Sequence, residues 1–184
     1  MFTRCLLADF YKMKRSSVII AHIIIPIVVS AVFLAYYAIS GWNETDKITA
    51  FYETLGSAFP VLIGIFIAST MEQEQNAGAF QNLLTLRSKT AAFFSKVVTL
   101  LLLSLFALLF TAGLFGCGFN MIHEQSEASM GVFIMAALVM WLSAIPLYLI
   151  FGIFAFVFGK AFAIGAGLIS GLISALFLTD IGMY

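Results

Sequence analysis

The chain has 184 residues, of which 62% are hydrophobic and only 10% are charged. About one quarter of the residues in a soluble domain carry a charge, so this sequence has too few charges to cover a water-facing surface. The composition excludes a soluble enzyme and a nucleic-acid-binding protein, and it indicates an integral membrane protein. Nine basic and nine acidic residues cancel, so the net charge points to no class of partner.

Five apolar stretches are candidates for membrane-spanning helices. A helix needs about 20 mostly apolar residues to cross a hydrocarbon core of about 30 Å. The first stretch is too long for a cleavable signal peptide, so we interpret it as a retained span. We therefore predict an all-α polytopic membrane protein with one transmembrane domain over residues 1–184. The five predicted spans cover residues 17–40, 55–71, 97–119, 131–159 and 161–178.

The basic residues divide unevenly between the two sides of this arrangement. Eight of the nine precede the first span or fall in the loops on the same side, and Lys47 is the exception. Because basic residues are retained on the cytoplasmic side of a membrane, the sequence predicts a cytoplasmic N-terminus. Ser88 should then face the cytoplasm and Glu124 the outside.

The N-terminal segment, residues 1–16, has the pattern of a short amphipathic helix. Phe2, Leu6, Phe10 and Met13 recur at helical spacing, with Cys5 beside them. Basic residues accompany this stripe, as in helices that lie in the membrane interface with their apolar face in the lipid boundary. We expect such an interfacial helix; the alternative is a basic flank that only sets the topology.

Residues 72–90, between the second and third spans, are too polar to cross the membrane. Phe80, Leu83 and Leu84 share one face of a short predicted helix, because they lie at positions i, i+3 and i+4. Acidic residues precede this helix and basic residues follow it, an order that complements the helix dipole. Such a helix would lie on lipid or dock into a groove of a soluble partner. The alternative is a solvated loop.

The same segment carries a resemblance to a transporter family. A glutamate-rich exit from the second span is followed by Gly78, by the pair Leu83 and Leu84, and by a basic turn that leads to Lys96. The chain resembles the permease subunits of type-2 ABC exporters, most closely those of the lantibiotic-immunity ABC transporters of Gram-positive bacteria. The other parts of the sequence that add to the resemblance are residues 8–17, His22 and Pro26.

This resemblance implies a permease that works with an ABC ATPase subunit and with a second permease, identical or homologous. The implied substrate is a lantibiotic or similar antimicrobial peptide, expelled through the bacterial plasma membrane to protect the cell. Two alternatives stay open: export of another hydrophobic drug or lipid-like substrate, and a non-transporting immunity protein. The residues to which we assign ATPase coupling are Glu72, Glu74, Gly78, Phe80, Leu83, Leu84 and Leu86.

The resemblance also implies six spans with both termini in the cytoplasm, whereas the sequence offers five. Tyr184 lies where the outer loop before a sixth span would begin. We therefore expect the natural chain to continue with another apolar run of about 20 residues.

Motifs for chemistry are sparse in the sequence. A phosphate-binding loop needs Gly-x-x-x-x-Gly-Lys-Ser/Thr, but the pair Gly159-Lys160 is followed by Ala161. We therefore expect no nucleotide site, catalytic residue, metal or cofactor in this chain, and we expect ATP hydrolysis in a separate subunit. His22 is the only ionisable residue well inside a predicted span. A packing role for a neutral ring and a functional role both stay open.

Small residues recur at every fourth position of the fifth predicted span. Ala163, Gly167, Gly171 and Ala175 share one face of this helix, and small residues let membrane helices approach closely. We predict a helix-packing face here. The sequence leaves open whether it contacts this chain or another permease copy.

Overall fold

The computed structural model describes residues 2–14, 16–76, 78, 81, 88–123 and 128–178. Within these residues the chain forms six helices and no strands, and five of the helices are long and apolar enough to cross a membrane. The predicted all-α polytopic fold is confirmed. The helices are α1 (Phe2–Met13), α2 (Ser17–Ile39), α3 (Glu44–Asn76), α5 (Lys89–Ile122), α6 (Met130–Phe158) and α7 (Lys160–Leu178).

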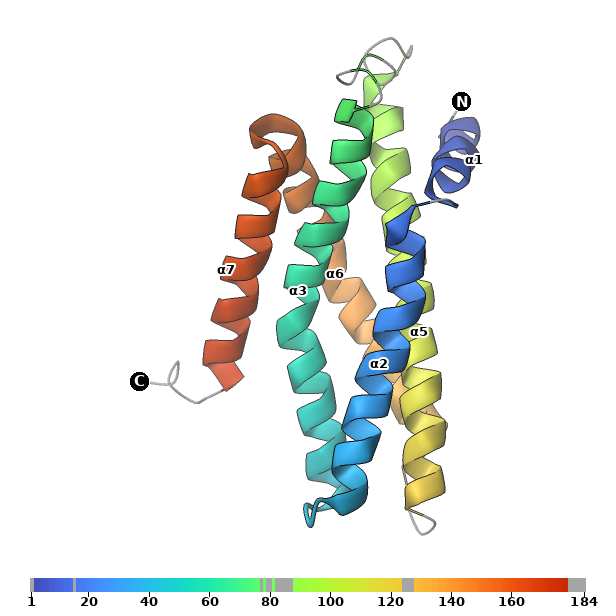
Figure 1. Ribbon diagram of the computed structural model, residues 1–184, viewed down its shortest axis with the longest axis vertical. Helices are drawn as coiled ribbons and strands as arrows, with labels where there is room; N and C mark the ends of the chain where they lie inside the picture. Colours follow the sequence, from blue (N-terminus) through green and yellow to red (C-terminus); the bar gives the residue numbers. More distant parts are fainter. Residues whose placement is uncertain are drawn as a thin grey trace.

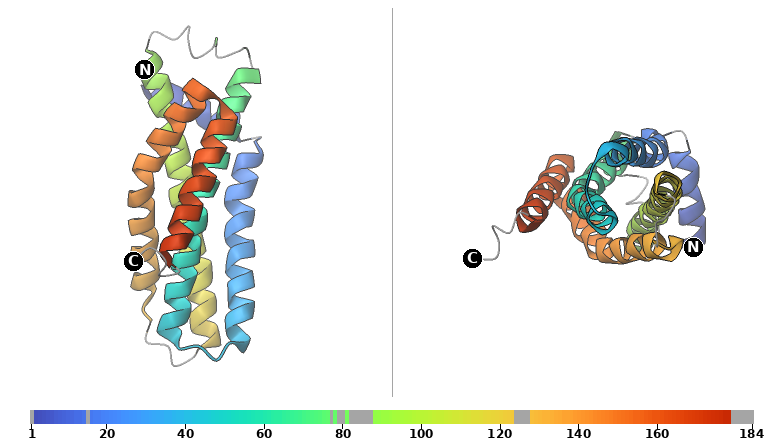
Figure 2. Two further views of the ribbon diagram at one scale, coloured as in Figure 1. Left: turned by 90° about the vertical axis from the view of Figure 1, so that its left-hand side faces the viewer. Right: turned by 90° about the horizontal axis from the view of Figure 1, so that it is seen from below.

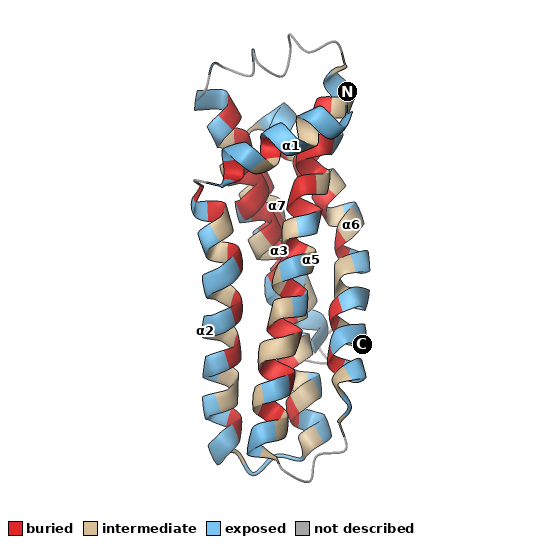
Figure 3. Ribbon diagram, turned by 90° about the vertical axis from the view of Figure 1, so that its right-hand side faces the viewer, coloured by how far each residue is buried: buried red, intermediate tan, exposed pale blue. Residues whose placement is uncertain are grey.

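The long helices α2, α3, α5 and α6 run side by side and surround a common core (Figure 1, Figure 2). α7 packs outside this group, against α3 and α6. α1 lies across one end of the bundle, against α5 (Figure 3). We call this end the α1 end and the opposite one the far end. The turn between α6 and α7 also lies at the α1 end.

Capping residues explain where several helices begin and end. Ser16 precedes α2, and its Oγ accepts a hydrogen bond from the Val18 amide at 3.2 Å. Ser88 caps α5 in the same way, accepting from the Ala91 amide at 3.3 Å. Both contacts satisfy backbone donors that have no partner inside the helix. α6 ends at Gly159, whose φ of +89° lies in the region that favours glycine.

α3 and α5 are longer than a bilayer core requires. They contain 33 and 34 residues, which corresponds to about 50 Å of helix at 1.5 Å per residue. Because a hydrocarbon core is about 30 Å thick, both helices extend well beyond it. The predicted second span, residues 55–71, covers only the middle of α3.

The outward faces of the long helices are apolar, as a lipid environment requires. On α2, the side chains of Ile20, Ile24 and Val28 are each at least half exposed. Buried residues lie on the opposite, inward face of the same helix (Figure 3). The pattern matches a helix with one side against protein and the other against lipid.

Aromatic side chains fill the core at the far end. Phe51 of α3 stacks on Phe115 of α5 with ring centroids 3.7 Å apart. Phe119 and Phe133 lie near Phe115, and all four side chains are completely buried. Large rings therefore bridge α3, α5 and α6 at the far end.

Lys47, the exception in the charge pattern, is buried in this aromatic core. Its Nζ donates to the Tyr37 carbonyl at 3.1 Å and to Nε2 of His123 at 2.9 Å. Since the ammonium can only donate, Nε2 of His123 is the acceptor. The other ring nitrogen, Nδ1, then donates to the Phe119 carbonyl at 3.2 Å. The far-end lysine is thus held by neutral acceptors rather than by solvent.

The predicted small-residue face of α7 lies against α3 of the same chain. A Cβ atom added to Gly167 would lie 2.8 Å from the Pro60 carbonyl oxygen and 3.2 Å from the Gly64 Cα. Ala163 and Gly171 are buried in the same contact, and Ala175 is partly buried. The two backbones meet so closely that a larger residue at Gly167 has no room.

We expect Gly167→Ala to weaken the bundle by about 1–3 kcal/mol, because the added methyl group meets backbone rather than a movable side chain. Thermal unfolding of the purified protein in detergent measures this loss. Gly165→Ala is the matched control on the same helix, since a Cβ atom there meets nothing within 4 Å. Equal melting temperatures for Gly167→Ala and the wild type would contradict the observed packing.

Candidate functional site

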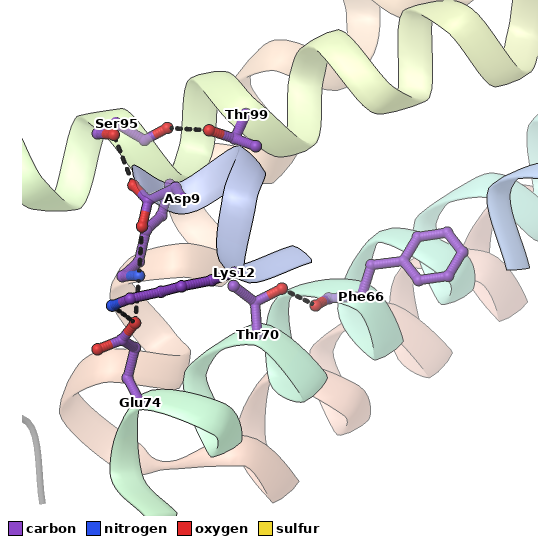
Figure 4. Close-up of polar contacts among 8 residues, drawn as sticks. Asp9, Lys12, Phe66, Thr70, Glu74, Ser95 and Thr99 are labelled. Carbon is purple, nitrogen blue, oxygen red and sulfur yellow. Dashed lines mark hydrogen bonds and ion pairs between the residues drawn. The ribbon is translucent and has the colours of Figure 1, made fainter. Parts of the chain in front are cut away.

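A cluster of charged side chains from three helices is buried at the α1 end. Lys96 of α5 donates from Nζ to Asp9 Oδ1 of α1 at 2.9 Å and to Glu74 Oε1 of α3 at 2.7 Å. Lys12 of α1 donates to the same Glu74 oxygen at 2.9 Å (Figure 4). The side chains of Lys96, Asp9 and Glu74 are only 6%, 9% and 6% exposed. We call these four side chains the ion cluster.

Hydroxyl groups and an amide extend the ion cluster into the neighbouring helix turns. Ser95 Oγ donates to the second carboxylate oxygen of Asp9, Oδ2, at 2.5 Å (Figure 4). Gln73, next to Glu74 on α3, donates from Nε2 to Ser16 Oγ at 2.7 Å. Ser16 also caps α2. The joint between α1 and α2 is therefore bonded directly to the end of α3.

The ion cluster is electrically balanced, with two carboxylates and two ammonium groups. Burying a charge is costly unless it is paired and hydrogen-bonded, and each buried member here has an opposite charge within 2.9 Å. Removing one partner of a buried pair costs about 3–5 kcal/mol, because the remaining charge stays uncompensated. The position of α1 on the bundle thus depends on the ion cluster as well as on apolar packing.

α1 turns its predicted apolar stripe toward the bundle, whereas the sequence predicts that this stripe faces lipid. The helix forms, but Met13 is 2% exposed and Asp9 is buried beside it against the bundle. Leu7 and Tyr11, at 70% and 80% exposed, point away from the protein instead. Asp9, on the same inward side of the helix, bonds to Lys96. Of that stripe, Cys5, Leu6 and Phe10 are partly covered and Phe2 is exposed.

The residues assigned to ATPase coupling fall into three groups. Glu74 belongs to the ion cluster, whereas Glu72 pairs with Lys160 at the start of α7. Gly78 follows the end of α3 with a φ of +135°, a conformation that favours glycine. The structure therefore places both glutamates in contacts between helices. The remaining coupling residues, Phe80, Leu83, Leu84 and Leu86, lie outside the described residues.

Sequence reasoning missed Asp9 and the pairing of Glu74 with Lys96. The sequence does contain one indication of a buried ion pair. Asp9 interrupts the predicted apolar stripe of α1, between Leu6 and Met13. An acid in that position needs a buried cation. The sequence offers several lysines, and only the packing of α1 on α5 selects Lys96.

Within the described residues, no three His, Cys, Asp or Glu side chains are grouped to hold a metal ion. A pocket of about 220 Å³ opens beside the ion cluster, lined in part by Thr70 and Gln73. The ion cluster therefore joins α1, α3 and α5, and a pocket lies beside it.

A bundle of five helices able to span a membrane, joined at one end by buried ion pairs, defines a polytopic membrane protein. Its sequence matches the family described as ABC-2 family transporter protein over residues 5–176. The chain belongs to this family, and it is the membrane permease component of an ABC transporter. Family membership implies an ABC ATPase as a partner subunit. No curated protein and no solved structure matches the chain.

We expect Lys96→Met to release α1 from the bundle, because it leaves Asp9 and Glu74 buried without their shared cation. The free energy that holds α1 in place should fall by about 3–5 kcal/mol. Hydrogen exchange of the amides in α1 measures the release. Lys89→Met, at an exposed position on the same helix, should leave exchange unchanged. Unchanged protection of α1 in Lys96→Met would show that apolar contacts alone hold it.

Proposed function

We propose that this permease exports a lantibiotic or similar amphipathic antimicrobial peptide from a bacterial cell, with the α1 end in the cytoplasm. The orientation is supported by the basic residues of the described chain. Lys47 lies at the far end, and basic side chains are retained on the cytoplasmic side of a membrane. The basic residues described at the α1 end are Arg4, Lys12, Lys14, Lys89, Lys96 and Lys160.

The observation that carries the mechanism is the ion cluster. Glu74 stands in the last turn of α3, just before the segment that we assign to ATPase contact. Through Lys96 this turn is tied to α1 and α5, and through Glu72 it is tied to the start of α7. A displacement of the segment by the closing ATPase dimer would therefore move α1, α5 and α7 together with α3.

The contact with the ATPase is assigned to the apolar face of Phe80, Leu83 and Leu84. Apolar groups at helical spacing outside the bilayer gain free energy only when they are covered. Burying one such side chain contributes about 1.5–3 kcal/mol. A groove on a soluble subunit would provide this burial, as in other helix-in-groove complexes.

The substrate class is supported by the resemblance to lantibiotic-immunity permeases. Acidic residues on the proposed outer side, such as Glu44, Asp46 and Glu53, would favour a cationic peptide near the exit. A second permease copy would complete the transport path. The acidic loops also have a simpler explanation, since basic residues are kept inside, so the resemblance carries more weight than the charge.

A labelling experiment tests the orientation. We expect a cysteine placed at Ser88 to be labelled from the cytoplasmic side and a cysteine placed at Glu124 from the outside. The background should be a cysteine-free chain, because Cys117 is exposed. Intact cells are treated with an impermeant maleimide before and after lysis. Labelling of the Ser88 position in intact cells would reverse the orientation.

Substitution of the apolar face tests the coupling assignment. Phe80→Asp and Leu84→Asp would place an unpaired charge in the contact, which is costly, so each should abolish co-purification of the ATPase and peptide resistance. Membrane insertion should be normal, because the segment is already polar. Gln81→Asp, on the opposite side of the predicted helix, is the control and should keep the ATPase bound. If all three variants lose the ATPase equally, the face is assigned wrongly; if all three keep it, the segment is not the docking element.

A further inference from the structure

An apolar cleft lies between α2 and α3 in the membrane-spanning part of the bundle. Its lining comes from three helices and includes Ala21 and Pro26 of α2, Leu62 and Phe66 of α3, and Ala107 of α5. α2 packs mainly on α5 rather than on α3, so the seam between α2 and α3 is the weaker contact of the two. The enclosed part of the cleft has a volume of about 30 Å³, enough for about two groups the size of water.

His22, Ser104 and Thr111 are the polar residues in the lining of this cleft, and the two hydroxyls donate to carbonyls of their own helix. His22 is the one with a side-chain atom left unpartnered among the described residues. The side chain is 3% exposed, and its ring lies 4.1 Å from the Phe66 ring. Nδ1 is 2.7 Å from the Val18 carbonyl oxygen. Because a carbonyl only accepts, Nδ1 carries the hydrogen, and Nε2 of the neutral ring is left as an acceptor. Nε2 is buried and has no hydrogen-bond partner among the described residues.

Pro26 adds a second acceptor at the same position. In a regular helix the amide of residue 26 would donate to the carbonyl of His22, but proline has no N–H. The His22 carbonyl therefore lacks its usual helical partner. An acceptor buried without a donor is unfavourable, so this site is suited to a group that donates.

We propose that the cleft is a lipid-facing substrate site that binds a neutral hydrogen-bond donor, a hydroxyl or an amide N–H, carried on an apolar chain. The donor would occupy the enclosed space and bond to His22 Nε2, and the chain would lie along the seam between α2 and α3. An ammonium group fits poorly, because none of the described residues that line the cleft is a carboxylate and an unpaired buried charge is costly.

Both lipid hydroxyls and peptide amides have this chemistry. The role as a substrate site rests on the proposed export function, whereas binding itself does not. The test therefore uses the purified permease without an ATPase. A loss of export with intact binding would count against the export function and not against the site.

Photolabelling with three probes of equal chain length tests the site. The probes are a twelve-carbon alcohol, the corresponding secondary amide and the methyl ether of the alcohol, each with a diazirine in the chain. Labelled peptides are mapped by mass spectrometry. We expect the alcohol, the amide or both to label residues 21–26 and 55–66, and the methyl ether, which cannot donate, to label them several-fold less. Preference for the alcohol would indicate a lipid-like ligand, and preference for the amide a peptide.

Variants connect the labelling to His22. His22→Leu removes the acceptor and should reduce specific labelling roughly five- to tenfold. Ala107→Leu keeps His22 but places a larger side chain in the lining of the cleft. It should reduce labelling to a similar extent, because less space remains for the probe. Ile24→Leu, on the exposed face of α2, should leave labelling unchanged. Gel filtration confirms that each variant is folded. Equal labelling by the methyl ether, unchanged labelling of both cleft variants, or no labelling of the wild type would each overturn the proposal.

Discussion

The ammonium group of Lys96 connects three helices at the α1 end of the bundle. It lies between Asp9 and Glu74, two carboxylates from helices that are far apart in the sequence, and all three side chains are buried. None of them can leave without stranding a charge in a region of low polarity. The ion cluster therefore joins α1, α3 and α5 at this end, although α3 and α5 share few close backbone contacts.

Different interactions join the helices at the far end of the bundle. Stacked aromatic rings such as Phe51 and Phe115 join the helices there, and Lys47 is satisfied by a carbonyl and a neutral histidine. The two ends of the bundle are thus joined by different interactions, buried ion pairs at the α1 end and stacked aromatic rings at the far end.

α3 connects the features that matter for function. Its last turn contributes Glu74 to the ion cluster, its middle meets α7 at Gly64, and Phe66 forms part of the cleft that holds His22. α7 is joined to α3 by close backbone contact, whereas α2 contacts α3 less than it contacts α5.

Much of the architecture follows from local sequence. Five apolar runs and the distribution of basic residues were enough to predict a polytopic helical protein, because crossing a bilayer imposes the same length and polarity on every span. The glycine spacing of α7 likewise showed a packing face. Sequence could not show that this face meets α3, that α1 turns Asp9 toward the bundle, or that Lys96 rather than another lysine pairs with Glu74. Those features depend on contacts between residues as far apart in the sequence as Ser57 and Gly171, and only the packing of the helices decides them.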